Sequence, residues 1–126
     1  MTQDPSDRES HVDIVKLLGT PDEELMEKFG HWYIPRRQPS YLRRNALVVL
    51  GNSGNRDDPE IDRVLRECLN SDEALVRSHA VWAAFRLNKK HLVTEQHPTS
   101  LLRDDPEGIV FAELQEWGIS MDGDVG

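Results

Sequence analysis

The sequence contains a single cysteine, Cys68, few aromatic residues (6%) and no long apolar run. One cysteine cannot form an intrachain disulfide, and alone it cannot hold zinc or an iron–sulfur cluster. The longest nearly apolar stretch, residues 46–50, is far shorter than the roughly 20 residues of a membrane helix. Residues 1–5 lack the basic and apolar regions of a signal peptide. These absences indicate a small protein of a reducing compartment, and we expect it to be cytoplasmic.

Acidic residues are in excess, but they are unevenly distributed. The net charge of the 126 residues is −8. Residues 31–56 nevertheless contain five arginines and neither Asp nor Glu, so the rest carries the other ten basic residues and all 23 acidic ones. An acidic body with one basic band predicts a localised binding surface for an anion more specifically than the mean charge does.

Helical patterns cover most of the chain, and we find no segment that alternates long enough to be a strand. In residues 58–69 the apolar positions follow the spacing of a helix with one buried face, and Asp58-Pro59 is a typical start. The segment after Ser71-Asp72 is apolar on most sides, which predicts a helix packed between neighbours. The predicted helices are 10–19, 20–29, 40–50, 58–69, 72–87 and 105–117, with loops at 51–55 and 88–104 except for one turn near 100–102.

An internal repeat of about 34 residues relates 42–50 to 76–84, matching Arg43 with Arg77 and Ala46 with Ala80. A weaker third copy relates 72–76 to 105–109. The pattern Asp-x-x-x-Val-Arg-x-x-Ala-x-x-Ala from Asp72 to Ala83 is typical of HEAT-like repeats. The sequence therefore predicts an all-α fold, a HEAT-like α-solenoid of two to three helix pairs. It would occupy residues 10–117, between a disordered tail at 1–9 and a flexible tail at 118–126.

Three stretches narrow the comparison to one family: Trp-Tyr-Ile-Pro-Arg-Arg at 32–37, Arg-Asn-Ala…Leu-Gly-Asn within 41–54, and Val-Arg-x-His-Ala-x-Trp-Ala within 75–87. Together they resemble the C-terminal HEAT-like domain of epoxyqueuosine reductase, over about residues 11–117. That family reduces epoxyqueuosine to queuosine in tRNA, using cobalamin and two four-iron–four-sulfur clusters. The catalytic part, which supplies the cluster cysteines, is missing here. The chain is then either a piece of a longer protein or a separate small one.

The resemblance implies a non-catalytic module with no cofactor of its own. It also implies two partners, a tRNA anticodon arm and the catalytic domain of the same family. The candidate tRNA contacts lie in or beside the basic band: Arg36, Arg37, Tyr41, Arg43, Arg44 and Arg56. The alternative is a solvated helix face that balances the acidic body. For Arg43 and Arg77 a second alternative is a hydrogen-bonding role between repeats.

No catalytic residue and no metal site is predicted. The five histidines lack metal-ligand spacing, and no nucleophile lies beside a base in the sequence pattern. His79 and Trp82 are interpreted as a hydrogen-bonded core histidine beside a packed indole. The alternative function is a HEAT-like protein–protein interaction scaffold, which the net charge of −8 also suits.

Overall fold

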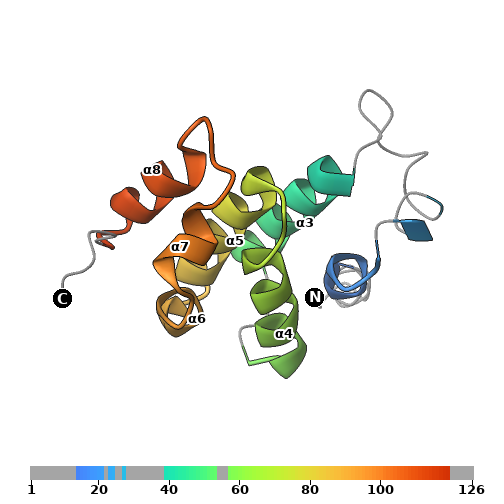
Figure 1. Cartoon of the computed structure of the whole chain (residues 1–126). Helices are drawn as coiled ribbons and strands as arrows, with labels where there is room; N and C mark the ends of the chain where they lie inside the picture. The colour runs from blue at the N-terminus through green and yellow to red at the C-terminus, as the bar shows by residue number, and fades with distance from the viewer. Residues whose placement is uncertain (1–13, 22, 25–26, 28–38, 54–56, 120–126) are drawn as a thin grey trace.

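Helices account for the regular structure in the computed structural model of the chain, which describes residues 14–21, 23, 24, 27, 39–53 and 57–119 (Figure 1). No strand occurs in these ranges, so the all-α prediction is confirmed for them. A helical turn at 14–18 comes first. The helices that follow are α3 (Pro39–Ser53), α4 (Pro59–Leu69), α5 (Ala74–Arg86), α6 (Lys90–Thr94), α7 (Pro98–Leu102) and α8 (Ile109–Glu116).

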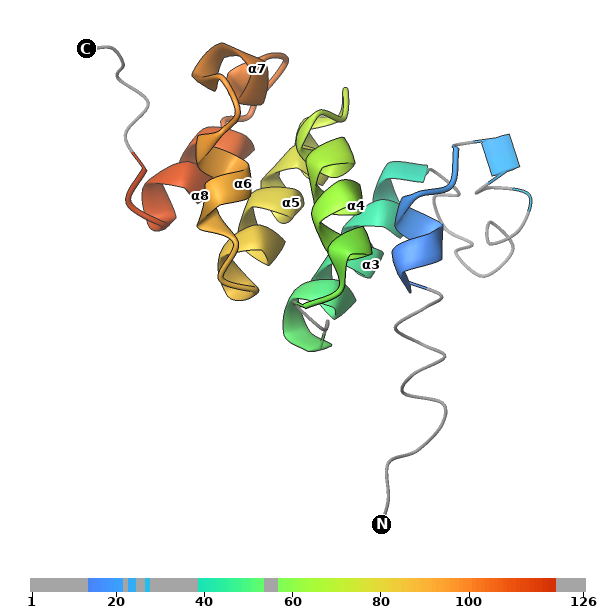
Figure 2. The ribbon, with the colours of Figure 1, turned by 90° about the horizontal axis from the view of Figure 1, so that it is seen from below.

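Helix α5 lies at the centre and packs against α3, α4, α6 and α8. Its buried residues include three alanines, Ala80, Ala83 and Ala84, whose small side chains let neighbouring helices approach closely. Figures 1 and 2 show α3, α5 and α8 side by side in one layer, with α4 and α6 in a second layer against α5. The prediction that this apolar segment is packed between neighbours is therefore confirmed.

Helix α4 follows the sequence prediction closely. The Asp58 carboxylate caps it by accepting a hydrogen bond from the Glu60 amide (3.0 Å), and Pro59 takes a first-turn position where no N–H is required. The predicted apolar stripe is buried and faces the core. Each such side chain contributes about 1.5–3 kcal/mol by its removal from water. The buried residues are Ile61, Val64, Leu65, Cys68 and Leu69.

Two ion pairs join α4 to the residues that flank α6, Lys89 and Glu95. The Lys89 ammonium lies 2.7 Å from Asp62 Oδ1, with side chains 13% and 30% exposed. Asp62 Oδ1 is itself shielded from water, and the Lys89 ammonium is its partner. Arg66 Nε lies 2.7 Å from the Glu95 carboxylate in a more exposed pair, which contributes little because water screens it.

The observed helices differ from the predictions at several places. Helix α5 begins at Ala74 with Glu73 at its N-cap, because Ser71 Oγ accepts from the Glu73 amide and closes a turn first. Helix α8 begins only at Ile109, since the Asp105 carboxylate reaches forward to accept the amides of the first α8 turn (2.9–3.2 Å). Helix α6 was predicted as loop, because five residues are too few to display a period.

Helix α3 also continues through Gly51, Asn52 and Ser53, which were predicted as a loop. The reason is tertiary: Gly51 is buried against the Trp82 indole of α5. A Cβ added at Gly51 would lie 2.5 Å from Trp82 Cζ3, closer than any normal contact. The absence of a side chain at Gly51 therefore lets the ends of α3 and α5 meet.

We expect Gly51→Ala to destabilise the protein by about 1 kcal/mol. The overpacking cost of about 1–3 kcal/mol exceeds the gain of about 1 kcal/mol from the higher helix propensity of alanine. In a Trp82→Leu background, the same change should stabilise the protein, because the obstacle is gone. Urea unfolding of the double-mutant cycle measures this coupling. Equal effects of Gly51→Ala in both backgrounds would contradict the contact.

Candidate nucleic-acid interface

The six residues predicted to contact tRNA are only partly within the described structure. Arg36, Arg37 and Arg56 lie outside the described residues. Tyr41 belongs to the backbone of α3, but its side chain is not described. Arg43 and Arg44 are adjacent on α3, and both are half-buried. The structure therefore tests the surroundings of two of the six.

Arg43 holds the helical turn at 14–18 against α3. Its guanidinium donates to the carbonyl oxygens of Leu18 (3.0 Å) and Thr20 (2.5 Å). These carbonyls lie at the C-terminal end of the turn, where the helix leaves acceptors without intrahelical donors and where positive charge is favourable. The bonds support the alternative in which Arg43 joins neighbouring segments rather than contacting a ligand.

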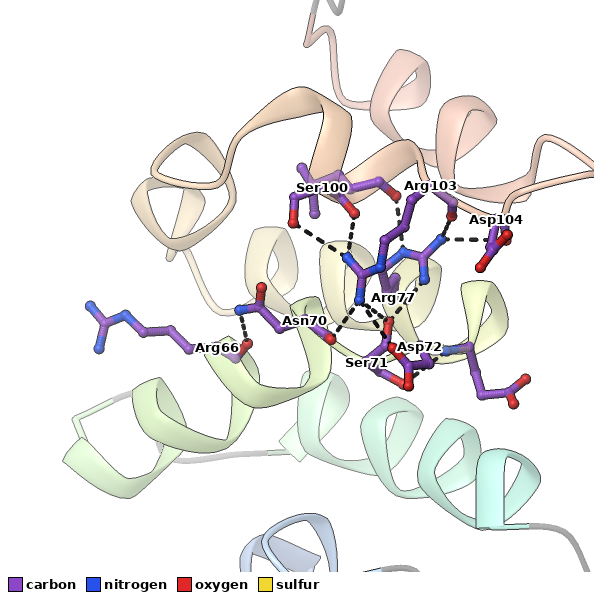
Figure 3. Close-up of polar contacts among 10 residues, drawn as sticks. Arg66, Asn70, Ser71, Asp72, Arg77, Ser100, Arg103 and Asp104 are labelled. Atoms are coloured by element: carbon purple, nitrogen blue, oxygen red, sulfur yellow. Dashed lines mark hydrogen bonds and ion pairs between the residues drawn. The ribbon is translucent and has the colours of Figure 1, made fainter.

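Arg77, the repeat counterpart of Arg43, is fully buried and binds main-chain carbonyls in the same manner (Figure 3). It donates to the carbonyl oxygens of Leu101 (3.0 Å), Ser71 (2.8 Å) and Arg103. Desolvation, followed by the nearby Arg103 guanidinium, lowers the pKa of Arg77 from its ordinary value. Arg77 therefore connects α5, the α4–α5 loop and the end of α7 through neutral acceptors.

Arg103 reinforces the same junction from the end of α7. As Figure 3 shows, its guanidinium meets that of Arg77 at the Ser71 carbonyl, which accepts a bond of 3.0 Å from Arg103. It also donates to the carbonyls of Asn70 (2.8 Å) and Ser100 (2.6 Å). Two guanidinium groups thus fix the α4–α5 loop against α7, and the carbonyl oxygens between them offset the repulsion of like charges.

We expect Arg77→Met to cost about 3 kcal/mol or more, because it removes the donors to the Leu101 and Arg103 carbonyl oxygens, and each such loss costs about 1–3 kcal/mol. Arg63→Met is the matched control. Arg63 makes exposed ion pairs with Glu60 and Glu67 on α4, and its removal should cost under about 1 kcal/mol. Urea denaturation of both variants measures the difference. A destabilisation at position 77 no greater than at position 63 would contradict the junction.

Arg44 lies on the outward stripe of α3, and its Nε donates to Asn45 Oδ1 (3.1 Å). The stripe follows helical spacing, opposite the buried Leu42, Ala46 and Leu50. Helix α3 contains two arginines and no acidic residue along its whole length. The structure therefore describes part of the predicted basic band as a face of α3 that has no Asp or Glu. The stripe consists of Arg44, Asn45, Val48, Val49 and Asn52.

Arg86 on α5 is a cation beside α3 that the charge count over 31–56 left out. Its guanidinium donates to Asn52 Oδ1 on α3 (3.2 Å) and lies over the Trp82 ring, with Cζ 5.7 Å from the ring centroid. Arg86 and Asn52 are 34 residues apart, the spacing of the internal repeat. The 34-residue repeat, which relates position 52 to position 86, is the only sequence signal that connects Arg86 with α3.

His79 and Trp82 are less buried than the sequence interpretation held. With its proton on Nδ1, His79 donates to the Leu75 carbonyl (3.0 Å), so the predicted hydrogen bond is present. Both side chains are only half-buried, on the side of α5 that also carries Arg86. The indole packs on Gly51 and under the Arg86 guanidinium. His79 and Trp82 therefore lie at the edge of the core, where each is partly exposed to solvent.

A pocket of about 290 Å³ lies where the 14–21 segment meets α4 and α5. Its lining includes Arg43, Glu67 and Cys68. Burial raises the pKa of the Cys68 thiol to about 12, so the thiolate that a nucleophile requires is scarce at neutral pH. Arg43 is engaged with main-chain carbonyls. The arrangement in this pocket indicates packing rather than chemistry.

We expect Cys68 to resist iodoacetamide in the folded protein up to about pH 9, because both burial and the raised pKa suppress the reactive thiolate. In urea above the unfolding midpoint, the thiol should react at the rate of an ordinary exposed cysteine. Mass spectrometry of timed samples measures this. Rapid labelling of the folded chain at pH 7 would contradict the buried environment.

A metal site and a membrane-spanning helix are both absent from the described ranges. No group of three or more His, Cys, Asp or Glu residues is placed to hold a metal ion there. No described helix has the length and apolar character to cross a membrane. No protein-family model, no curated protein and no solved structure matches the chain. The residues themselves are therefore the basis on which a function can be inferred.

Proposed function

We propose that this chain is a non-catalytic helical repeat module that binds RNA through the basic face of α3. The observation that carries the proposal is the outward face of α3, which carries Arg44 and no acid in a chain of net charge −8. Arginine matches phosphate oxygens with paired N–H donors, and its binding releases condensed counterions from the nucleic acid. An acid-free helix face avoids the repulsion that a phosphate backbone would meet elsewhere on this protein.

The HEAT-like solenoid belongs to the same proposal. It is supported by Arg43 and Arg77, which are 34 residues apart in sequence and each bind carbonyls of a neighbouring segment. It is also supported by the layer in which α3, α5 and α8 lie side by side. In a solenoid each helix pair buries its face against the next and leaves one continuous surface for a ligand.

Transfer RNA is the substrate class that we propose, and the choice comes from the resemblance to the epoxyqueuosine reductase domain. Charge alone favours RNA without selecting one. In this proposal the anticodon arm lies across α3 and a catalytic domain of that family is the second partner. The chain then contributes affinity and orientation, while the reaction and its cofactors belong to the partner.

A protein-interaction scaffold is the second candidate, and two exposed apolar side chains favour it. Val49 is 44% exposed on the outward stripe of α3, and Phe111 is 43% exposed on α8. Aromatic side chains such as Phe111 are enriched in the cores of protein interfaces. The two functions differ in their salt dependence, because an apolar interface does not depend on counterion release.

The test of RNA binding is the substitution of Arg36, Arg37 and Arg44 by Gln in the full chain. We expect affinity for a labelled anticodon stem–loop RNA at low salt to fall by more than about tenfold. The log–log salt slope should become shallower by about 0.7–0.9 for each arginine–phosphate pair that the substitutions remove. Fluorescence anisotropy at several salt concentrations measures both quantities.

The matched control substitutes Lys16, Arg63 and Arg66 by Gln, which removes the same charge from exposed positions outside α3. It should leave affinity and slope within about twofold of the wild type. Circular dichroism melting of each variant establishes that it is folded. If the two triple variants behave alike, the α3 face is only a solvated surface and the scaffold becomes the better proposal.

A further inference from the structure

Helix α5 shares the charge character of α3. Its sequence contains Arg77 and Arg86 and no acidic residue, although it lies outside the acid-free stretch at 31–56. The adjoining helix of the second layer, α4, contains Glu60, Asp62 and Glu67. The acid-free character is thus shared by the neighbouring helices α3 and α5 and is not confined to one stretch of sequence.

The C-terminal halves of α3 and α5 form one continuous surface. Trp82 of α5 packs on Gly51 of α3, and Arg86 donates to Asn52 Oδ1 one turn from that contact. Arg86 therefore sits at the junction of the two helices rather than on an isolated surface. Along α3, eight residues at about 1.5 Å each separate Arg44 from Asn52, so the arginines at 44 and 86 stand roughly 12 Å apart along the helix axis.

Arg86 differs in its partners from the arginines of the second layer and its loops and from Lys89. Arg63, Arg66, Lys89 and Arg103 each lie within 4 Å of a carboxylate. Among the described residues, no carboxylate lies within that distance of the Arg86 guanidinium, whose partners are an amide and an indole. Its charge is therefore not neutralised by a neighbouring acid and can attract an external anion.

The two neutral partners also restrict the motion of this exposed side chain. The bond to Asn52 uses one of five N–H donors, and the Trp82 ring supports the guanidinium from one side. A long side chain held before binding loses less conformational entropy when a ligand binds. Asn52 and Trp82 thus hold Arg86 ready to receive an anion with its remaining donors.

We propose that the RNA-binding surface crosses from α3 onto α5, and that Arg86 binds a backbone phosphate of the same RNA that Arg44 contacts. This inference rests on the proposed function and extends it to a helix outside the predicted basic band. Two arginines roughly 12 Å apart suit a ligand with repeated negative charges better than one with a single phosphate. In this arrangement Trp82 and Asn52 are positioning residues.

The experiment compares Arg86→Gln with Arg66→Gln in the full chain, with a labelled anticodon stem–loop RNA as the probe. Both changes remove one exposed charge, but Arg66 lies on α4 and is paired with Glu95. We expect Arg86→Gln to weaken binding about eightfold near 50 mM monovalent salt, the factor that corresponds to a slope change of about 0.7. Arg66→Gln should change neither affinity nor slope. Melting curves establish that both variants fold.

The outcomes separate this inference from the proposed function. If the triple variant of Arg36, Arg37 and Arg44 weakens binding but Arg86→Gln does not, the surface stops at α3 and this inference is wrong. Equal reductions of affinity by Arg86→Gln and Arg66→Gln would overturn it too, because they indicate a general charge effect. If the wild-type chain binds no RNA at low salt, both proposals fail. Polyglutamate that competes as well as RNA, in an Arg86-dependent manner, would identify an acidic protein as the partner instead.

Discussion

The buried Arg77 guanidinium is the interaction on which the arrangement of the helices depends. Burying a cation is costly, and here the compensation comes from carbonyl oxygens of two separate segments, the α4–α5 loop and the end of α7. Those segments cannot move apart without leaving the charge unsolvated in the interior. Helix α5, the α4–α5 loop and the end of α7 are therefore held in one geometry.

Local signals in the sequence predicted α4 and the all-α class, because the Asp58-Pro59 start and the buried stripe are properties of consecutive residues. They did not predict the extension of α3, where the low helix propensity of Gly51 is outweighed by its contact with Trp82. They also missed α6, which is too short for a period. Arg86 became a candidate only when packing brought α5 beside Asn52, since charge counts along a chain do not register neighbours in space.

A net charge of −8 and a basic binding surface are compatible because all the acids lie outside α3 and α5. Exposed charges are screened beyond about 10 Å at moderate ionic strength, so an approaching anion responds to the nearest side chains rather than to the sum. The second layer engages several of its acids internally, as in the pairs of Asp62 with Lys89 and Glu95 with Arg66. The mean charge is therefore a poor guide to what this face attracts.

The acceptors around Arg43 and Arg77 are main-chain oxygens, which every residue type supplies. Positions such as Leu18, Thr20 and Ser71 can therefore change identity in the course of evolution without breaking the bond, provided the backbone path is kept. The arginine itself cannot be exchanged so easily, because its planar fork supplies the several donors that these carbonyls need. A contact of this kind permits the sequence around one retained arginine to diverge widely. It therefore leaves few invariant positions by which a sequence comparison can detect relatives.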